Sequence, residues 1–433
     1  MKIVLLSTYQ AFGGAAVAAS RLHRALLKSG MDSTLLIGTP RRQERWQPET
    51  GAISLTDSLL TDGLSLGRFV GERLAFLPYE KDPSVRFQFS PGVFGTGLSH
   101  HQSIEAADVI HLHWTTFGML SVAGIGELLR LGKPVVWTMH DMWAFTGGCH
   151  HSGTCERYQQ QCGNCEPFLK RPGPNDLSRR VWQRKRQAYS HGLLAPVACS
   201  EWLANRARKS SLFDGLSVSA IPNPLDTDQF SPTDKLLARQ ELGVQSNKRL
   251  LLFAAAKIGA AGKGFAYFRE ALTHLHAQLP DPTAIELLIF GIGNAGQLRD
   301  LPFRVHFLGP LSDVRQISLA YSAADVFVIP SLFENLPNTI MESMACGTPV
   351  VGFEIGGIPE MIRHKQTGYV AEYRSVEDLA AGLFWVLDQP AETYDRMAQA
   401  ARQFVLDHYD ESVVATCYRT LYEGLLHQNT SPE

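Results

Sequence analysis

The feature that most constrains the fold of this chain is a regular alternation of short apolar segments with helix-length stretches, which occurs twice along the sequence. The first series begins with the apolar run from Lys2 to Ser7 and extends to residues 218–221. The second series begins at Arg249 and extends to residues 349–352. Strands separated by helices are typical of parallel sheets, because each parallel pair needs a long crossover connection. The sequence therefore predicts an α/β protein with two doubly wound domains.

The two series are separated by a proline-rich segment, IPNPLDTDQFSP, which shows no periodicity and predicts an inter-domain connection. It divides the chain into a domain over residues 1–221, a domain over 222–409 and a C-terminal helix over 410–433 that packs back on the first domain. Residues 40–100 carry no motif and no predicted element. Ligands of doubly wound sheets bind beyond the carboxyl ends of the strands, so we expect the site in a cleft between the domains.

Charge and hydropathy exclude two functional classes. The formal net charge of −2 does not favour a nucleic-acid partner. No apolar run approaches the ~18 residues of a transmembrane helix, and the first run is shorter than the ~7–15 residues of a signal-peptide core. The sequence therefore predicts a cytoplasmic protein, in which cysteines are thiols or metal ligands rather than disulfides.

Two loops that follow the first strand of each domain carry candidate phosphate contacts. Gly13 and Gly14 stand between a strand and a helix, where backbone N–H groups and the helix dipole favour an anion. A tight structural turn explains these glycines equally well. Lys257 and Lys263 follow the first strand of the second domain, where a cation neutralises a diphosphate. A solvated surface lysine is the alternative interpretation of each.

The segment from Ser331 to Glu360 is the most informative. A predicted strand leads to Glu334 in a loop, and Glu342 follows eight residues later, within a predicted helix. Carboxylates accept two strong hydrogen bonds and therefore suit the paired hydroxyls of sugars and ribose. A helix cap with a surface glutamate explains either residue alone.

The E-x7-E spacing of these glutamates resembles the signature of retaining glycosyltransferases of family 4 (group 1), especially those of exopolysaccharide and colanic-acid-type biosynthesis. The resemblance extends to the Gly13-Gly14 loop, residues 138–141 (TMHD), residues 222–230 and Lys263-Gly264. It implies the GT-B fold, in which two Rossmann-like doubly wound domains face each other across a cleft.

The resemblance also implies roles for individual residues. Glu342 binds the ribose hydroxyls, and Glu334 holds hydroxyls of the donor sugar with backbone amides near Asn335 and Leu336. Lys263 neutralises the diphosphate, with Lys257 where many members have an arginine. The remaining implied contacts are Gly13 and Gly14 near the phosphates or the acceptor and His140 at the transferred sugar. The resemblance implies no catalytic metal. It also implies retention by front-face attack, in which the leaving phosphate helps to deprotonate the acceptor.

His140 has two interpretations. It stands at a strand end beside Asp141 and before an aromatic loop, where a packed, hydrogen-bonded histidine is common. Its position at the carboxyl end of a strand and the family resemblance favour a catalytic role.

Four cysteines, Cys149, Cys155, Cys162 and Cys165, lie close together in an insertion over residues 147–166. Their spacing, C-x5-C-x6-C-x2-C, suggests a structural zinc site; free thiols or a labile disulfide, and an iron–sulfur cluster, are the other hypotheses. The resemblance covers these cysteines without identifying a metal. Cys199, Cys346 and Cys417 are predicted to be buried apolar residues.

A helical pattern runs from Leu177 to Tyr189. Its basic stretch over residues 178–186 predicts either peripheral contact with the inner face of a membrane or a solvated helix face. The residues of the predicted contact are Arg179, Arg180, Trp182, Arg184, Lys185 and Arg186.

Together these features predict a retaining hexosyltransferase that moves a sugar from a nucleotide-sugar donor to a glycan or lipid-linked acceptor, in bacterial surface polysaccharide biosynthesis. An epimerase or phosphorylase on the same fold and a non-catalytic partner protein are the alternatives. The FGGAA turn lacks the G-x-G-x-x-G pattern of dinucleotide-binding oxidoreductases.

Overall fold

A computed structural model describes residues 1–38 and 51–430, and the chain divides into two compact units. Unit 1 comprises Met1–Asn223 with Val414–Glu433, and unit 2 comprises Pro224–Val413. The first boundary lies two residues after the predicted one, and the return to unit 1 begins four residues later than predicted. Leu225 pairs with Asp410 in a parallel bridge, so both segments near the boundary are bound together within unit 2.

Unit 1 contains a parallel seven-stranded sheet in the order β3-β2-β1-β4-β5-β6-β7. Its strands are β1 (Lys2–Ser7), β2 (Asp32–Ile37), β3 (Ala52–Ser54), β4 (Val109–Leu112), β5 (Val135–Met139), β6 (Leu194–Ala198) and β7 (Ser219–Ala220). Its α-helices are α1 (Gly14–Lys28), α2 (Leu59–Phe76), α3 (Gln102–Ala106), α4 (Val122–Leu129), α5 (Leu177–Tyr189), α6 (Glu201–Arg208) and α15 (Glu411–Thr430), which begins in unit 2.

Unit 2 contains a parallel six-stranded sheet in the order β10-β9-β8-β11-β12-β13. Its strands are β8 (Arg249–Lys257), β9 (Ile285–Ile292), β10 (Val305–Gly309), β11 (Val326–Ile329), β12 (Val350–Phe353) and β13 (Gly368–Ala371). Its α-helices are α7 (Lys235–Glu241), α8 (Phe265–Gln278), α9 (Ala295–Leu298), α10 (Val314–Ala323), α11 (Asn338–Ala345), α12 (Ile358–Met361), α13 (Val376–Leu387) and α14 (Ala391–His408). The predicted α/β class with two doubly wound sheets is confirmed.

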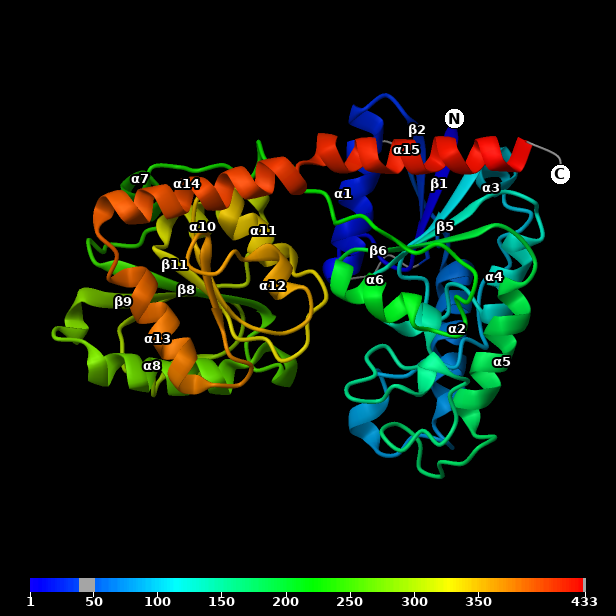
Figure 1. Ribbon diagram of the computed structural model, residues 1–433, viewed down its shortest axis with the longest axis horizontal. Coiled ribbons are helices and arrows are strands. Elements are labelled where there is room, and N and C mark those ends of the chain that lie inside the picture. Colours follow the sequence, from blue (N-terminus) through cyan, green and yellow to red (C-terminus); the bar gives the residue numbers. More distant parts are fainter. Residues whose placement is uncertain (39–50, 431–433) are drawn as a thin grey trace. The chain divides into compact units, whose positions relative to one another are not determined.

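The sheet of unit 1 is buried on both faces because alternate residues of its strands point to opposite sides. Val4 and Leu6 of β1 pack in a core with α4, α5 and α6. Ile3 and Leu5 pack in a second core with α1 and α15. Figure 1 shows α15, in red, returning to the same unit as the blue N-terminal elements. The last helix of the chain is therefore part of the first unit's core.

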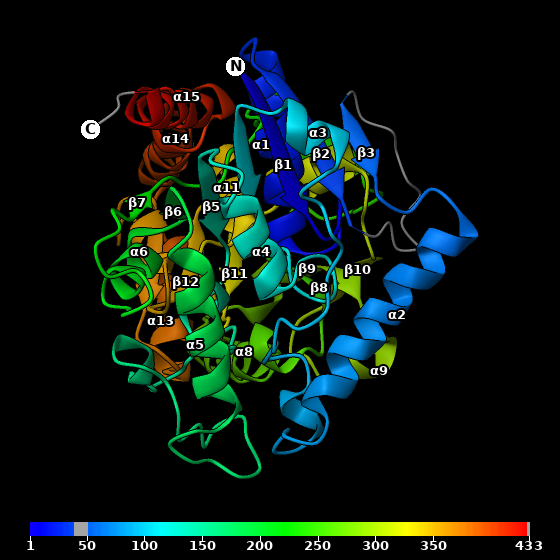
Figure 2. The same cartoon turned by 90° about the vertical axis from the view of Figure 1, so that its right-hand side faces the viewer.

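The helix α2 was not predicted. It spans 18 residues within residues 40–100, for which no element was predicted. Residues 40–50 of that range lie outside the described part. Three glycines, Gly63, Gly67 and Gly71, lower its helix propensity, and its apolar residues are not confined to a buried face. Figure 2 shows α2 as a long blue helix at the margin of unit 1. The strand β13 was also missed.

The helix α5 has the predicted bounds, but two of the residues predicted to contact a membrane are buried. Trp182 and Lys185 are buried in unit 1, whereas Arg180 and Arg186 are exposed. The prediction that Trp182 and Lys185 contact a membrane is therefore wrong, because the core of unit 1 occupies their side chains.

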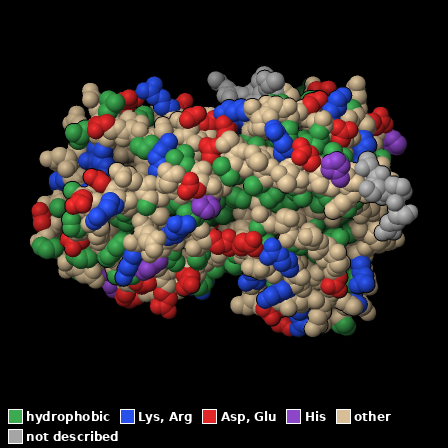
Figure 3. Space-filling model, turned by 45° about the horizontal axis from the view of Figure 1, so that its top comes forward, with side chains coloured by type: hydrophobic (Ala, Val, Ile, Leu, Met, Phe, Trp, Pro, Cys, Tyr) green, Lys and Arg blue, Asp and Glu red, His purple; other side chains and the backbone are tan. Residues whose placement is uncertain are grey.

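Within the described ranges, no helix is both long enough and apolar enough to cross a bilayer. On the face drawn in Figure 3, basic and acidic side chains are interspersed rather than gathered by sign, in keeping with the small net charge.

Candidate active site

The strand order of unit 1 reverses between β1 and β4, because the chain moves outward to β2 and β3 before it returns to β4. At such a point the connections on either side diverge and leave room for a ligand at the carboxyl ends of the strands. The segments that leave this edge are the loop to Gly13 after β1 and the loop beginning at His113 after β4. His140 follows the neighbouring strand β5.

Gly13 is the N-cap of α1, and Gly14 is the first residue of the helix. Gly13 has φ 87°, which favours glycine, while a Cβ there would meet no heavy atom within 4 Å. No side chain caps the helix, and its first turn holds no acidic residue. The positive φ angle, rather than steric crowding, therefore explains the glycine at this position. The space beside the helix N-terminus is open.

His140 pairs with His113, which was not among the residues predicted for the site. Its Nε2 lies 3.0 Å from Nδ1 of His113, and the two rings stack with centroids 5.3 Å apart. Burial lowers the pKa of His140 to about 4, although Asp141 acts in the opposite direction. Burial also holds the pKa of His113 well below its ordinary value. Both rings are therefore neutral at pH 7, and one donates an N–H to the other.

Asp141 fixes the loop after β5. Its carboxylate accepts hydrogen bonds from Trp114 Nε1 at 2.9 Å and from the backbone N–H of Trp143 at 2.7 Å. His150 Nδ1 lies 2.7 Å from the same carboxylate. Burial alone would raise the pKa of Asp141, but His150 and these hydrogen bonds hold it below its ordinary value. Asp141 is therefore ionised and holds the loop beside His140 in place through these hydrogen bonds.

A second polar network lies beneath this loop. His111 bonds Tyr422 at 2.7 Å through Nδ1 and Thr138 at 2.8 Å through Nε2, and Thr138 also bonds Tyr418 at 2.7 Å. Burial lowers the pKa of His111 to about 3. The network joins α15 to β4 and β5, the strands that precede His113 and His140.

In unit 2 the strand order reverses between β8 and β11. Lys263 lies in the loop after β8, and Glu334 lies in the loop after β11. Gly264 holds the two loops together: its φ is 67°, and a Cβ there would lie 1.7 Å from the carbonyl oxygen of Pro330. Only glycine permits this approach.

The structure brings together two of the predicted donor residues. Nζ of Lys263 lies 2.5 Å from Oε1 of Glu334. The lysine side chain is 42% exposed and the glutamate side chain is 12% exposed. The ammonium group can therefore turn toward solvent, while the carboxylate stays in place.

The loop of Glu334 is held on its other side by Gly356. This glycine has φ 61°, and a Cβ there would lie 1.7 Å from the carbonyl oxygen of Glu334. The N–H of Gly357 donates to the carbonyl oxygen of Asn335 at 2.8 Å. Asn335 and Leu336 are buried, so this part of the loop is fixed by packing as well as by hydrogen bonds.

Glu342 lies in the middle of α11 and is buried. The hydroxyl of Tyr321, on α10, donates to its Oε2 at 3.2 Å. Tyr321 was not selected from the sequence, which offers no signal for a partner 21 residues before Glu342. Lys257 stands at the end of β8, and its exposed side chain makes no hydrogen bond or ion pair within the described residues. The structure does not bring Lys257 to Glu334 as it brings Lys263.

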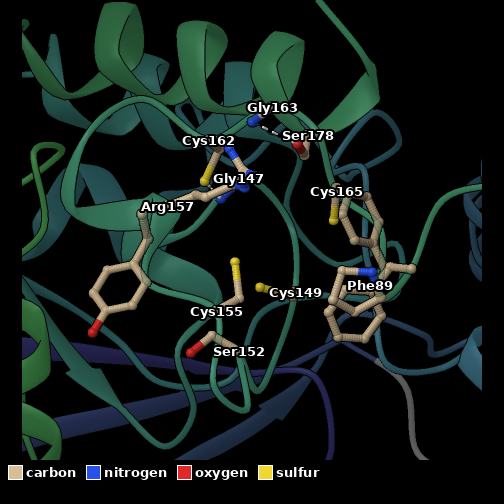
Figure 4. A pocket seen from close by; sticks show the side chains of 13 residues that line it. Phe89, Gly147, Cys149, Ser152, Cys155, Arg157, Cys162, Gly163, Cys165 and Ser178 are labelled. Carbon is tan, nitrogen blue, oxygen red and sulfur yellow. Dashed lines mark hydrogen bonds between the residues drawn. The ribbon is translucent and has the colours of Figure 1, made fainter. Parts of the chain in front are cut away.

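The four clustered cysteines line one small cavity in unit 1, and all four are free thiols (Figure 4). Burial raises the pKa of Cys162 to about 11 and that of Cys165 to about 12. In the described part of the chain, no three histidine, cysteine or carboxylate side chains are already placed to hold a metal ion. The zinc hypothesis therefore stays a prediction. Of the other cysteines, Cys199 and Cys346 are buried as predicted, but Cys417 is exposed.

Two family models match this chain. Residues 12–229 match the model described as Glycosyltransferase Family 4, and residues 248–389 match that of Glycosyl transferases group 1. The first match covers β2 to β7 of unit 1 and extends a short way into unit 2, and the second covers β8 to β13 of unit 2.

Relatives and solved structures agree with the family models. The chain is 28% identical to the D-inositol 3-phosphate glycosyltransferase of Mycobacteroides abscessus over 349 residues, which are 78% of this chain and 71% of that protein. Its fold is similar to that of sucrose-phosphate synthase from Thermosynechococcus elongatus, with a TM-score of 0.67, 19% identity and 99% of both chains covered. HepE of Anabaena, solved in complex with UDP and glucose, gives a TM-score of 0.61 at 15% identity, covering 98% of this chain and 99% of HepE.

Proposed function

Since the chain belongs to glycosyltransferase family 4, we propose that it is a retaining enzyme that transfers a sugar from a nucleoside-diphosphate sugar to a glycan or lipid-linked acceptor. The chain is a hexosyltransferase of class EC 2.4 with the GT-B fold. The observation that carries the proposal is the contact of Lys263 with Glu334 at the strand-order reversal of unit 2, with buried Glu342 in the helix α11 that follows.

The contact between Lys263 and Glu334 suits a donor with a diphosphate and a sugar. A diphosphate attracts the ammonium group away from the carboxylate, because phosphate oxygens carry more negative charge. Glu334 then accepts hydrogen bonds from sugar hydroxyls. Lys263 thus supplies cationic charge at the leaving group, so the proposal includes no catalytic metal. The acceptor oxygen would attack from the face that the leaving phosphate departs from, which keeps the configuration at the anomeric carbon, and the phosphate would take the acceptor proton.

Glu342 is proposed to bind the ribose. Its hydrogen bond from Tyr321 orients the carboxylate, and a carboxylate accepts from both vicinal hydroxyls of a ribose. Asn335 and Leu336 contribute backbone amides, and Gly13 and Gly14 contribute the open helix N-terminus of unit 1. Lys257 is proposed as a weaker second cation because no contact fixes it.

His140 is proposed to act through hydrogen bonds rather than charge. Burial keeps its ring neutral at pH 7, and His113 fixes the ring orientation. A neutral imidazole can bond a sugar hydroxyl without adding positive charge near an oxocarbenium-like transition state, which a cation would destabilise.

The acceptor is proposed to be lipid-linked, with the enzyme at the inner face of a membrane in surface polysaccharide assembly. The proposed apolar contact with the membrane is a row of exposed residues on α2 and just after it, rather than on α5. Its residues are Leu59, Leu60, Leu64, Leu66, Val70, Leu74 and Leu77. An amphipathic helix with such a row binds the bilayer interface.

Exposed basic side chains near α2 favour binding of this face to an anionic bilayer. The backbone N–H of Lys170 donates to Tyr79, and Arg180 lies over the Tyr79 ring at 5.2 Å, so the end of α2 adjoins α5. The exposed basic residues here are Lys81, Lys170, Arg171 and Arg180, with Asp82 and Glu166 as exposed acids. The excess of basic side chains complements anionic lipid headgroups.

Thermal melting with UDP, GDP and ADP tests the donor site. A nucleotide at ~100 times its dissociation constant adds ~2.7 kcal/mol to the free energy of unfolding. We expect one nucleotide to raise the melting temperature of the wild type by several degrees and to have little effect on Glu342→Ala. Glu270→Ala, an exposed glutamate on α8, is the control. Equal stabilisation of Glu342→Ala and Glu270→Ala by the nucleotide would contradict the role of Glu342. Incubation with labelled nucleotide sugars then tests transfer itself.

A further inference from the structure

Four thiols from one insertion converge on a single cavity of unit 1. Cys149, Cys155, Cys162 and Cys165 line it, together with backbone and aromatic groups, and Figure 4 shows their sulfur atoms surrounding the same space. The cavity volume is about 20 Å³, which holds one water-sized particle. A space of this size excludes an organic ligand and suits a single ion.

The nearby buried histidine is not available as a fifth candidate ligand. His150 uses Nδ1 for the carboxylate of Asp141 at 2.7 Å and Nε2 for the hydroxyl of Ser90 at 3.0 Å. Both of its ring nitrogens are therefore occupied. The ligand set at the cavity consists of thiols alone, which favours a soft or borderline metal ion over magnesium or calcium.

A buried lysine lies beside this cluster, and burial lowers its pKa to about 7. Lys185 is fully buried, and its Nζ donates to the carbonyl oxygens of Trp143 and Thr146. Within the described residues no carboxylate lies at ion-pair distance from it, and the groups whose charge would favour its charged form are Cys149 and Cys162, followed by the more distant Asp141. A buried ammonium without a counter-charge in direct contact is costly. An anionic cluster at the four sulfurs would supply that counter-charge.

The backbone between the lysine and the cluster also favours thiolate. Thr146 accepts from Lys185, and the N–H of the next residue, Gly147, donates to Sγ of Cys162 at 3.1 Å. Backbone N–H groups that bond ligand sulfurs are typical supports of metal–thiolate sites.

We propose that Cys149, Cys155, Cys162 and Cys165 bind one zinc ion in a tetrahedral structural site, with Lys185 as its buried counter-charge. Each thiol loses its proton to solvent on binding, and zinc forms four Zn–S bonds without a change of oxidation state. The four sulfurs are not yet at coordinating positions in this structure, so binding draws the cysteine side chains inward around the cavity.

The site would also stiffen the loop that holds the catalytic strand end. His150 directly follows Cys149, bonds the carboxylate of Asp141 and accepts the N–H of Met142 through its carbonyl oxygen at 2.9 Å. Asp141 is adjacent to His140. Zinc is thus a structural group whose loss would disturb His140 through His150 and Asp141.

Metal analysis of the purified full-length chain tests the site. We expect about one zinc per chain, as in structural four-thiolate sites, and its loss in Cys162→Ser but not in Cys417→Ser, whose thiol lies outside the cluster. Cobalt added to metal-free protein should give the absorption bands of tetrahedral thiolate coordination. A chain that is purified without metal and takes up neither zinc nor cobalt would overturn the proposal, as would bound iron with inorganic sulfide.

A second variant keeps the test valid if Cys162→Ser fails to fold. Lys185→Met removes the charge but fills a similar volume, and we expect zinc release to a chelator to become at least several-fold faster. Arg186→Met, one residue further on the exposed side of α5, is the matched control. Zinc release from Lys185→Met at the wild-type rate would overturn the assignment of Lys185 as counter-charge.

Discussion

The rings of His113 and His140 lie stacked at the carboxyl ends of adjacent strands, with Nδ1 of His113 3.0 Å from Nε2 of His140. Because burial keeps both rings neutral, a proton shared between them sets which nitrogen of His140 can donate to a ligand. His113 is therefore a positioning residue for His140.

Turnover should not depend on the protonation of His140 near neutral pH. Its pKa is lowered to about 4, so the ring stays neutral as the pH falls from 8 to 5.5. We expect His140→Ala to lower kcat without weakening nucleotide binding, and His113→Ala to lower kcat by a smaller factor. A wild-type pH profile with a limb near 6.5 that disappears in His140→Ala would contradict a neutral role.

Folding stability should fall when the solution is acidified. The pKa of His111 is lowered to about 3 by burial, whereas an unfolded histidine titrates near 6.5. The unfolded state therefore binds more protons below about pH 6.5, and the free energy of unfolding falls by up to about 1.4 kcal/mol per pH unit for each such histidine. Thermal melts between pH 7 and pH 4.5 check this. His111→Gln should flatten the dependence, and exposed His100→Gln should leave it unchanged.

Removing the charge of Lys263 should impair transfer. In Lys263→Met, no ammonium neutralises the diphosphate, and we expect kcat/KM to fall by about 10²-fold, as for the loss of one preorganised electrostatic contact. Lys257→Met should have a smaller effect, because no contact holds that side chain in place. Lys209→Met on the surface of unit 1 is the control. Kinetics with a saturating acceptor measure the difference, and equal losses for Lys257 and Lys263 would show that the Glu334 contact does not select the cation.

The apolar row of α2 should govern vesicle binding. Leu66→Gln with Leu74→Gln removes two exposed leucines, each worth ~1.5–3 kcal/mol when fully buried, so partition into anionic vesicles should fall at least tenfold. The matched control is Leu236→Gln with Leu237→Gln on α7 of unit 2. Co-sedimentation with anionic and neutral vesicles separates the apolar contribution from the basic one. Unchanged sedimentation of the α2 variant would reject this face as the membrane contact.

Most of the fold could be predicted because its strands are buried on both faces. The strand over Lys2–Ser7 and the helix over Leu177–Tyr189 have the predicted bounds, since each has a clear hydrophobic pattern. The helix α2 was missed because three glycines interrupt it, and because its apolar residues lie both in an exposed row and, at Phe76, on a buried side. Apolar residues on two sides weaken the periodicity that identifies a helix.

The site was predicted as a set of residues rather than as a set of contacts. Lys263 and Glu334 were both selected, but their contact spans 71 positions and depends on Gly264 fitting beneath Pro330. His113 was overlooked although it alternates with His111 at a strand end, where both side chains point to one face of the sheet. That alternation was the available signal. On α5, periodicity placed Lys185 correctly in a helix but did not reveal that its charged group is buried.

The packing of α15 has a consequence for the order in which the chain can fold during synthesis. Val414, Tyr418 and Tyr422 cover a face of the sheet whose first strand begins at Lys2. A ribosome therefore releases all of unit 2 before it supplies the helix that completes unit 1. Until then the nascent unit 1 exposes an apolar sheet face and leaves His111 without Tyr422. A chain that stops before residue 414 would keep every strand of both sheets and still lack a finished first unit, so premature termination yields an aggregation-prone protein rather than a smaller enzyme.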